Sequence, residues 1–269
     1  MKVTDVHIHS MGGEDPKKFV AAMDEAGLDR AVVFAGFPVD VEKQRKRIDT
    51  VVEFSKAAPG RILPFAWIEP FHEGCLDALE YAKEAGCVGL KMIPNHWYPY
   101  DDNAMKLYEK VQELRIPILF HSGILWAFED SSRFCRPCFF EALLHTPKVK
   151  FALAHISWPW TDECLATAGR MRAAVSRSGG DRPEMQMYID CTPGTPMFYR
   201  EEALDRAFRY IGADYLMYGS DQRVSADGEA LATNIRRDRE FLQSHLSRTA
   251  EECEKFFSGT FDSYMKPME

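Results

Sequence analysis

Two histidines, His7 and His9, stand one residue apart in the apolar run VTDVHIHSMGG at residues 3–13. In an extended strand alternate side chains point to the same side, so both imidazoles face one way. Two imidazoles that converge on one point suit a metal ion or a proton-transfer site. Such a pair also arises by chance, so other residues must decide whether it forms a site.

Four more residues with metal-binding or acid–base chemistry fall near the ends of predicted strands. They are Lys91, His121, His155 and Asp221. When parallel strands form a barrel, the side chains at their carboxyl ends converge on one face. Several neutral imidazoles and one carboxylate suit a divalent cation, zinc first and manganese second. A single histidine at a strand end is more often only hydrogen-bonded, so the prediction depends on the whole set.

Short apolar runs alternate with amphipathic stretches along the chain. Eight runs are predicted to be strands: VTDVHIH, DRAVVFAG, RILPFAWIEP, CVGLKMIP, IPILFHSG, KVKFALAHIS, MQMYIDCTP and DYLMYGSD. The predicted helices lie near residues 15–27, 40–57, 74–85, 102–113, 136–145, 161–177, 199–209 and 228–246. Eight strand–helix pairs in strict alternation favour parallel strands, and they can close into a (β/α)8 TIM barrel of about 250 residues. We therefore expect one α/β domain over residues 1–269. An open sheet is the alternative, but no glycine-rich dinucleotide motif follows the first strand.

Local signals mark several helix ends. Asp15 precedes Pro16, which suits a first helical position, and Asp101 or Asp102 is expected to cap the fourth helix. Gly27 and Gly86 fit as the stops of the first and third helices.

Composition argues against several classes of function. The net charge is −8 and the basic residues are scattered, which argues against a nucleic-acid surface. The N-terminus enters a strand directly and no apolar run could span a bilayer, so we expect a cytoplasmic protein without a membrane partner. The seven cysteines, an odd number, indicate reduced thiols. The CxxC pair Cys135 and Cys138 has no second Cys or His pair at zinc-finger spacing. Homo-oligomer formation is left open.

Several phrases carry a family resemblance. DVHIH, GLKMIPN, IPILFHSG, FALAHIS and YGSD, in this order, resemble the amidohydrolase superfamily, and specifically its amidohydrolase-related branch of metal-dependent hydrolases and zinc-dependent decarboxylases. The resemblance runs from Asp5 to about residue 260 and implies a TIM barrel. It also implies a divalent metal held by His7, His9, His121 and Asp221.

Two residues of this resemblance leave the number of metal ions open. His155 is either a ligand of a second ion or a catalytic acid and base. Lys91 resembles a lysine that is carboxylated and bridges two ions in some relatives, and is unmodified in others. The resemblance therefore implies one or two ions per chain.

The loops beyond the strands suggest a substrate pocket for a small molecule. The loop after the fifth strand is long and carries Trp126 and Arg133, and long loops in compact domains usually have a function. Arg223 follows Asp221 closely and is expected to bind a substrate carboxylate in a forked contact. His96 is a further candidate for substrate contact. Asp190, at the end of the seventh strand, is expected to hydrogen-bond a ligand histidine.

The sequence favours a metal-dependent hydrolase of a small lactone, ester or amide that bears a carboxylate. Metal-bound water would be the nucleophile, Asp221 the general base, and His155 the group that polarises the carbonyl. The main alternative is a lyase, a decarboxylase or hydratase of a small carboxylic acid, on the same site. A binding protein without catalytic activity is a third hypothesis, which the intact ligand set disfavours.

Overall fold

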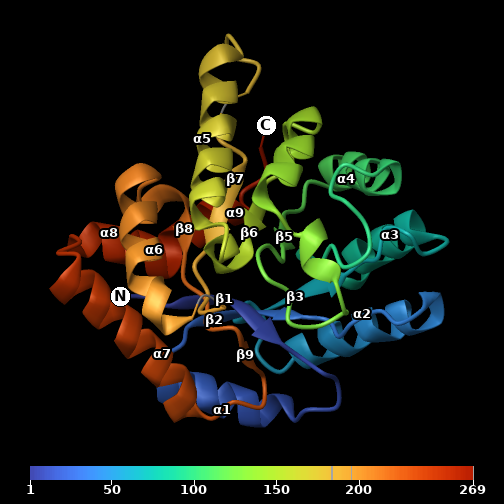
Figure 1. The fold of residues 1–269 in the computed structure, drawn as a ribbon. Coiled ribbons are helices and arrows are strands. Elements are labelled where there is room, and N and C mark those ends of the chain that lie inside the picture. Colours follow the sequence, from blue (N-terminus) through green and yellow to red (C-terminus); the bar gives the residue numbers. More distant parts are fainter. Residues whose placement is uncertain (183, 195, 269) are drawn as a thin grey trace.

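The computed structural model describes residues 1–182, 184–194 and 196–268 of the chain. Its strands form one parallel sheet surrounded by helices (Figure 1). The described strands are β1 (Thr4–His9), β2 (Arg30–Phe34), β3 (Ile62–Trp67), β4 (Gly89–Met92), β5 (Ile118–Phe120), β6 (Phe151–Leu153), β7 (Met187–Asp190), β8 (Leu216–Met217) and β9 (Gln222–Arg223).

The sheet closes on itself through the segment 216–223. In this segment β8 pairs with β7, β9 pairs with β1, and the Val6 amide donates a hydrogen bond of 3.1 Å to the Tyr218 carbonyl. β8 and β9 therefore occupy the position of the eighth strand together. Asp221, whose φ is 58°, interrupts this strand between them. The predicted (β/α)8 barrel is confirmed, with its eighth strand broken in two.

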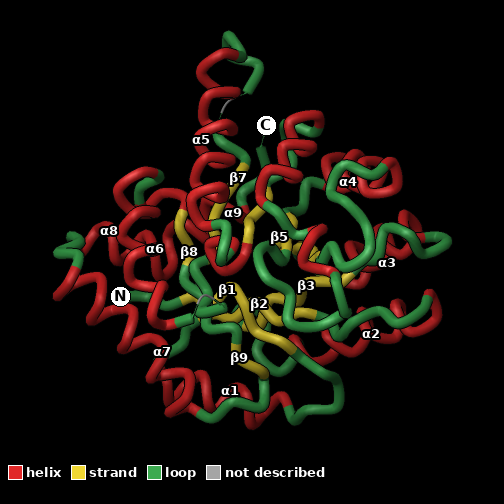
Figure 2. The backbone as a smooth tube through the Cα atoms, in the orientation of Figure 1, coloured by secondary structure: helices red, strands yellow, loops and turns green. Residues whose placement is uncertain are grey.

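Helices surround the strands, and Figure 2 shows the strands at the centre of the molecule. The described α-helices are α1 (Pro16–Ala26), α2 (Val41–Ser55), α3 (Cys75–Ala85), α4 (Asp102–Leu114), α5 (Thr161–Arg177), α6 (Met197–Tyr210), α7 (Gly228–Glu240), α8 (Ala250–Glu254) and α9 (Thr260–Met265). Short helical segments are η1 (Ser131–Phe134), η2 (Pro137–His145), η3 (Ala154–Ser157), η4 (Ala213–Tyr215), η5 (Phe241–His245) and η6 (Lys255–Gly259). No helix in the described ranges is long and apolar enough to cross a membrane.

The predicted helix ends are partly confirmed. The Asp15 carboxylate caps α1 by accepting from the Lys17 amide, and Gly27 and Gly86 end their helices in left-handed conformations. Asp101 lies at the N-cap of α4, but its side chain accepts from the Tyr98 amide, outside the helix.

Three helix predictions need correction. Residues 137–145 form a 3-10 helix rather than an α-helix, α7 ends at Glu240 and continues as a π-helical turn, and residues 250–265 form helices that were not predicted. These last helices follow the eighth strand, and their aromatic residues complete the barrel core. Phe261 and Tyr264 pack with Val6 and Phe65, and burying each large apolar side chain is worth about 1.5–3 kcal/mol.

A buried ion pair joins α6 and α7. Nη2 of Arg200 lies 2.5 Å from Oδ2 of Asp238, and both side chains are almost fully buried. We expect Asp238→Ala to lower the free energy of unfolding by about 3–5 kcal/mol, because the guanidinium would stay buried without its carboxylate. The matched control is Glu202→Ala on α6, which removes an exposed partner of Arg206 and should cost less than about 1 kcal/mol. Equal losses in denaturant unfolding of the two variants would contradict this prediction.

Candidate functional site

Ligand atoms of His7, His9 and Asp221 lie close together at the carboxyl ends of the strands. Nε2 of His7 lies 3.1 Å from Nε2 of His9 and 3.3 Å from Oδ1 of Asp221. Nε2 of His9 lies 3.2 Å from the same carboxylate oxygen. Ligand atoms bonded at about 2.0–2.1 Å to a tetrahedral zinc ion are about 3.3 Å apart. The three atoms thus have a spacing that suits ligands of one tetrahedral metal ion.

The backbone explains how the three side chains meet. His7 and His9 share one face of β1 because side chains alternate along a strand. Asp221 reaches them from the break between β8 and β9, where its left-handed backbone directs the carboxylate inward. Non-glycine residues in this conformation are uncommon and cluster at functional sites. Burial raises the pKa of Asp221, but its contacts with His7 and His9 outweigh burial and hold that pKa well below its usual range.

A buried carboxylate fixes the ring of His7. Nδ1 of His7 lies 2.5 Å from Oδ2 of Asp190, as expected for a metal ligand that is oriented by a neighbouring carboxylate. Burial raises the pKa of Asp190 to about 6, so the group is mainly ionised at pH 7. Burial and the charge of Lys91 lower the pKa of His7, which keeps its imidazole in the neutral form that binds metal.

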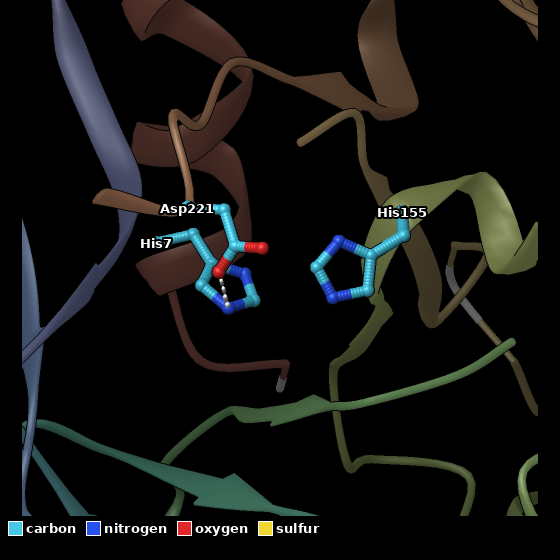
Figure 3. Close-up of side chains that lie close together, drawn as sticks. All are labelled: His7, His155 and Asp221. Carbon is cyan, nitrogen blue, oxygen red and sulfur yellow. Dashed lines mark ion pairs between the residues drawn. The ribbon is translucent and has the colours of Figure 1, made fainter. Parts of the chain in front are cut away.

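His155 faces this group from the end of β6. One ligand atom each from His7, His155 and Asp221 lies within 4.8 Å of the others, and Figure 3 shows the His155 ring turned toward the other two side chains. His155, Ile156 and Ser157 all have positive φ, so three consecutive left-handed residues present the ring. Burial lowers the pKa of His155 to about 3, which makes it neutral at pH 7.

Lys91 is buried beside the three ligand atoms. Its Nζ lies 3.3 Å from Nε2 of His7 and 4.7 Å from the centre of the Phe34 ring. Burial lowers the pKa of Lys91 to about 8, so the ammonium form still dominates at pH 7. A positive charge therefore lies next to the ligand atom of His7.

His121 lies in the wall of the same cavity as these residues. Its Nε2 is 3.1 Å from the carbonyl oxygen of Ile124, and its ring centre is 5.0 Å from that of His155. Nε2 therefore donates to a backbone carbonyl in this conformation. The metal-binding group found among the described residues consists of His7, His155 and Asp221, and it includes neither His121 nor His9.

These side chains lie in a cavity of about 480 Å³. Its walls are mainly aromatic and apolar: Met11, Trp67, Ile93, Leu125, Trp126, Phe128 and Trp158. Trp126 and Trp158 are stacked with ring centres 6.4 Å apart, and Arg223 also lines the cavity. The cavity thus combines aromatic walls with one arginine and one lysine.

Comparison with known proteins identifies the family. A family model described as amidohydrolase matches residues 4–260, nearly the whole chain. The chain belongs to this amidohydrolase family. Enzymes of the family act on small molecules, and the predicted resemblance is confirmed. No curated protein sequence matches the chain.

Solved structures confirm the fold of this family member. A 2,6-dihydroxybenzoate decarboxylase complexed with 2,6-dihydroxybenzoate superposes with a TM-score of 0.71 at 15% identity, covering 98% of this chain and 99% of that one. The 5-carboxyvanillate decarboxylase of Sphingomonas paucimobilis gives 0.69 at 13%, with 99% of each chain covered. The 4-oxalomesaconate hydratase of Rhodopseudomonas palustris gives 0.67 at 15%, with 98% and 95% covered. At sequence identities of 13–15%, the similarity to these structures shows a shared fold and does not show a shared activity.

The predicted substrate-binding residues divide into two groups. Trp126 and Arg223 line the cavity, whereas His96 and Arg133 are absent from the described residues that line it. Nε2 of His96 lies 3.7 Å from the carboxylate of Glu69, and Arg133 pairs with Asp130 at 3.2 Å. Of the two cysteines in the CxxC pair, Cys135 is buried and Cys138 is exposed. The metal-binding group found among the described residues includes neither of them.

The residues of this amidohydrolase site that were not predicted from its sequence include Trp67, Thr192 and Gly194. Trp67 is the last residue of β3, where the strand-end rule could have found it. Thr192 follows Asp190 by two residues and lies 2.7 Å from Nδ1 of His155. Gly194 packs against the same imidazole, at a sequence separation that gives no local signal.

Proposed function

We propose that the protein is a metal-dependent lyase that decarboxylates a small aromatic carboxylic acid. The observation that carries this proposal is the combination of a one-ion donor set with an aromatic cavity that is lined by Lys91 and Arg223. The known activities of several structural neighbours, including two decarboxylases, support the same choice. It reverses the order of the two leading hypotheses from the sequence, which placed hydrolysis first.

The donor set fits a single divalent cation. His7, His9 and Asp221 would hold it, since two imidazoles and one carboxylate at mutual distances of 3.1–3.3 Å are suitable ligands for zinc, with manganese as the second choice. When bound, the ion supplies a positive centre that stabilises negative charge developing on the substrate oxygens.

The chain's own residues would bind the substrate and move its protons. Arg223 is placed to form a forked contact with a carboxylate, and the aromatic walls to hold a planar ring. Asp221, held ionised, is placed to accept the proton of a substrate hydroxyl and return it to the ring carbon that bears the carboxylate. The bond between this ring carbon and the carboxylate carbon then breaks. Its electron pair returns to the ring, and carbon dioxide leaves. The resulting phenolate takes one proton from water, so the reaction consumes one proton overall.

Hydrolysis of a carboxylate-bearing lactone, ester or amide is the second candidate. The observation that favours it is the ionised Asp221 beside the proposed ion, because this is also the position of a general base for a water molecule. Both reactions use the same side chains, so only the products distinguish them.

A product screen tests the two candidates. The zinc-loaded protein would be incubated with hydroxybenzoates, unsaturated carboxylic acids, lactones and amides, and carbon dioxide and acid would be measured together. Release of carbon dioxide from an aromatic acid is the expected result. Acid production from a lactone, ester or amide, without carbon dioxide from any aromatic acid, would replace decarboxylation with hydrolysis. The metal-free protein is the control.

Lys91 determines how many ions are expected per chain. An ammonium group 3.3 Å from a ligand nitrogen repels a second cation, and a buried site screens this repulsion poorly. We therefore expect one tightly bound metal per chain, with or without added bicarbonate, and an intact mass without a carbamate. Two metals per chain that are lost in Lys91→Ala would contradict this, because a carboxylated lysine would then bridge two ions.

A further inference from the structure

The segment 190–194, which begins at the last residue of β7, contacts two histidines that enter the site from different strands. Asp190 meets His7 from β1, while Thr192 and Gly194 meet His155 beyond β6. The amide of Thr192 also donates to Oδ1 of Asp190 at 3.0 Å, which ties the two contacts together. One short piece of backbone therefore orients both imidazoles.

The contact with Asp190 places the ring hydrogen of His7 on Nδ1. An ionised carboxylate only accepts hydrogen bonds, so the nitrogen 2.5 Å from Oδ2 of Asp190 must be the donor. In a neutral imidazole the other nitrogen then carries a lone pair. Nε2 of His7 is the atom that faces His9 and Asp221, so the lone pair points to the proposed metal position.

The contact with Thr192 has the opposite effect on His155. Thr192 is fully buried, and within the described ranges its hydroxyl has one hydrogen-bond partner, Nδ1 of His155 at 2.7 Å. Leaving a buried hydroxyl hydrogen unpaired costs free energy, so the hydroxyl donates to Nδ1. The ring hydrogen of neutral His155 then lies on Nε2.

Gly194 also packs against this ring. A Cβ atom at residue 194 would lie 2.4 Å from Nδ1 of His155, which is closer than any real contact of this kind. Glycine therefore allows the backbone to lie directly against the imidazole. The close approach hinders rotation of the ring away from Thr192.

We infer that the segment 190–194 is a positioning segment that imposes opposite tautomers on the two histidines. His7 carries its hydrogen on Nδ1 and offers Nε2 to the metal, whereas His155 carries its hydrogen on Nε2. A protonated Nε2 cannot bind a metal ion, so His155 is not a ligand of the proposed ion. This role deepens the proposed function and rests on it for the identity of the metal.

Nitrogen-15 NMR of the full-length protein tests this inference without a substrate. Long-range couplings to the ring protons distinguish a protonated from an unprotonated ring nitrogen, and His7→Asn and His155→Asn variants assign the signals. In the metal-free wild type we expect protonated Nδ1 in His7 and protonated Nε2 in His155. Zinc should then move the Nε2 signal of His7 and leave the hydrogen on Nε2 of His155.

Substitutions of Thr192 isolate the hydroxyl. Thr192→Val should shift the His155 signals toward a mixture of both tautomers, and Thr192→Ser should restore the wild-type pattern. Thr260→Val is the matched control, since Thr260 is buried and donates to the Ala213 carbonyl before β8. It should leave both histidines unchanged.

The outcomes separate this inference from the proposed function. An Nδ1 hydrogen on His155 in the metal-free wild type, or loss of the Nε2 hydrogen when zinc binds, would overturn the inference even if carbon dioxide is released. The wild-type spectra decide this even if Thr192→Val does not fold. The expected tautomers together with a failure to bind any metal would instead contradict the proposed function.

Discussion

Replacing His7 and His9 together with alanine is expected to abolish metal binding and, with it, turnover. The two residues supply two of the three ligand atoms, which lie 3.1–3.3 Å from one another. Asp221 alone cannot retain the ion against water or a weak chelator, because affinity for zinc depends on several ligands acting together. Metal content after gel filtration, measured by mass spectrometry, checks the result.

A matched control for this variant removes two histidines elsewhere. His145 in η2 and His245 in η5 are both exposed and lie outside the cavity lining of the described residues. The double alanine variant at these positions should keep the wild-type metal content. Full metal occupancy in the His7 and His9 variant would end the interpretation of this group as a metal site.

Asp221→Asn is expected to keep the fold and to lower turnover by about 10²-fold or more, the scale typical of a lost acid–base group. An asparagine oxygen can still bind a metal, but an amide cannot accept and return a proton at neutral pH. The measurement is turnover of the zinc-loaded variant on the substrate that the product screen identifies, at equal metal content.

The control for Asp221→Asn is Asp214→Asn, because Asp214 is exposed and pairs with Lys255 outside the site. Its turnover should equal that of the wild type. If Asp221→Asn also turns over at the wild-type rate, the proton is carried by another group, and His155 is the next candidate.

The fold and the position of His7 and His9 on β1 were predictable because their signals are local. Apolar periodicity depends on residues a few positions apart, and it identified the strand segments of the barrel. The rule that functional residues lie at the carboxyl ends of barrel strands then selected His7, His9 and Lys91. The same rule placed Asp221 in the group, although the break in its strand was not foreseen.

The parts that were missed depend on contacts between distant residues. The left-handed backbone that presents His155, the turn of His121 toward Ile124 and the packing of Gly194 on His155 involve chain positions that periodicity does not connect. The helices over residues 250–265 complete a core whose other members come from the strands. Their role becomes visible only once the barrel is assembled.

Titration of the metal-free protein with zinc, while carbon dioxide release is followed, is the most direct test of a single-ion decarboxylase. The substrate would be the aromatic acid that the product screen identifies. The rate of carbon dioxide release should rise in proportion to added zinc and stop rising at one ion per chain. Release from the metal-free protein, or a rate that continues to rise up to two ions per chain, would contradict a one-ion lyase built on His7, His9 and Asp221.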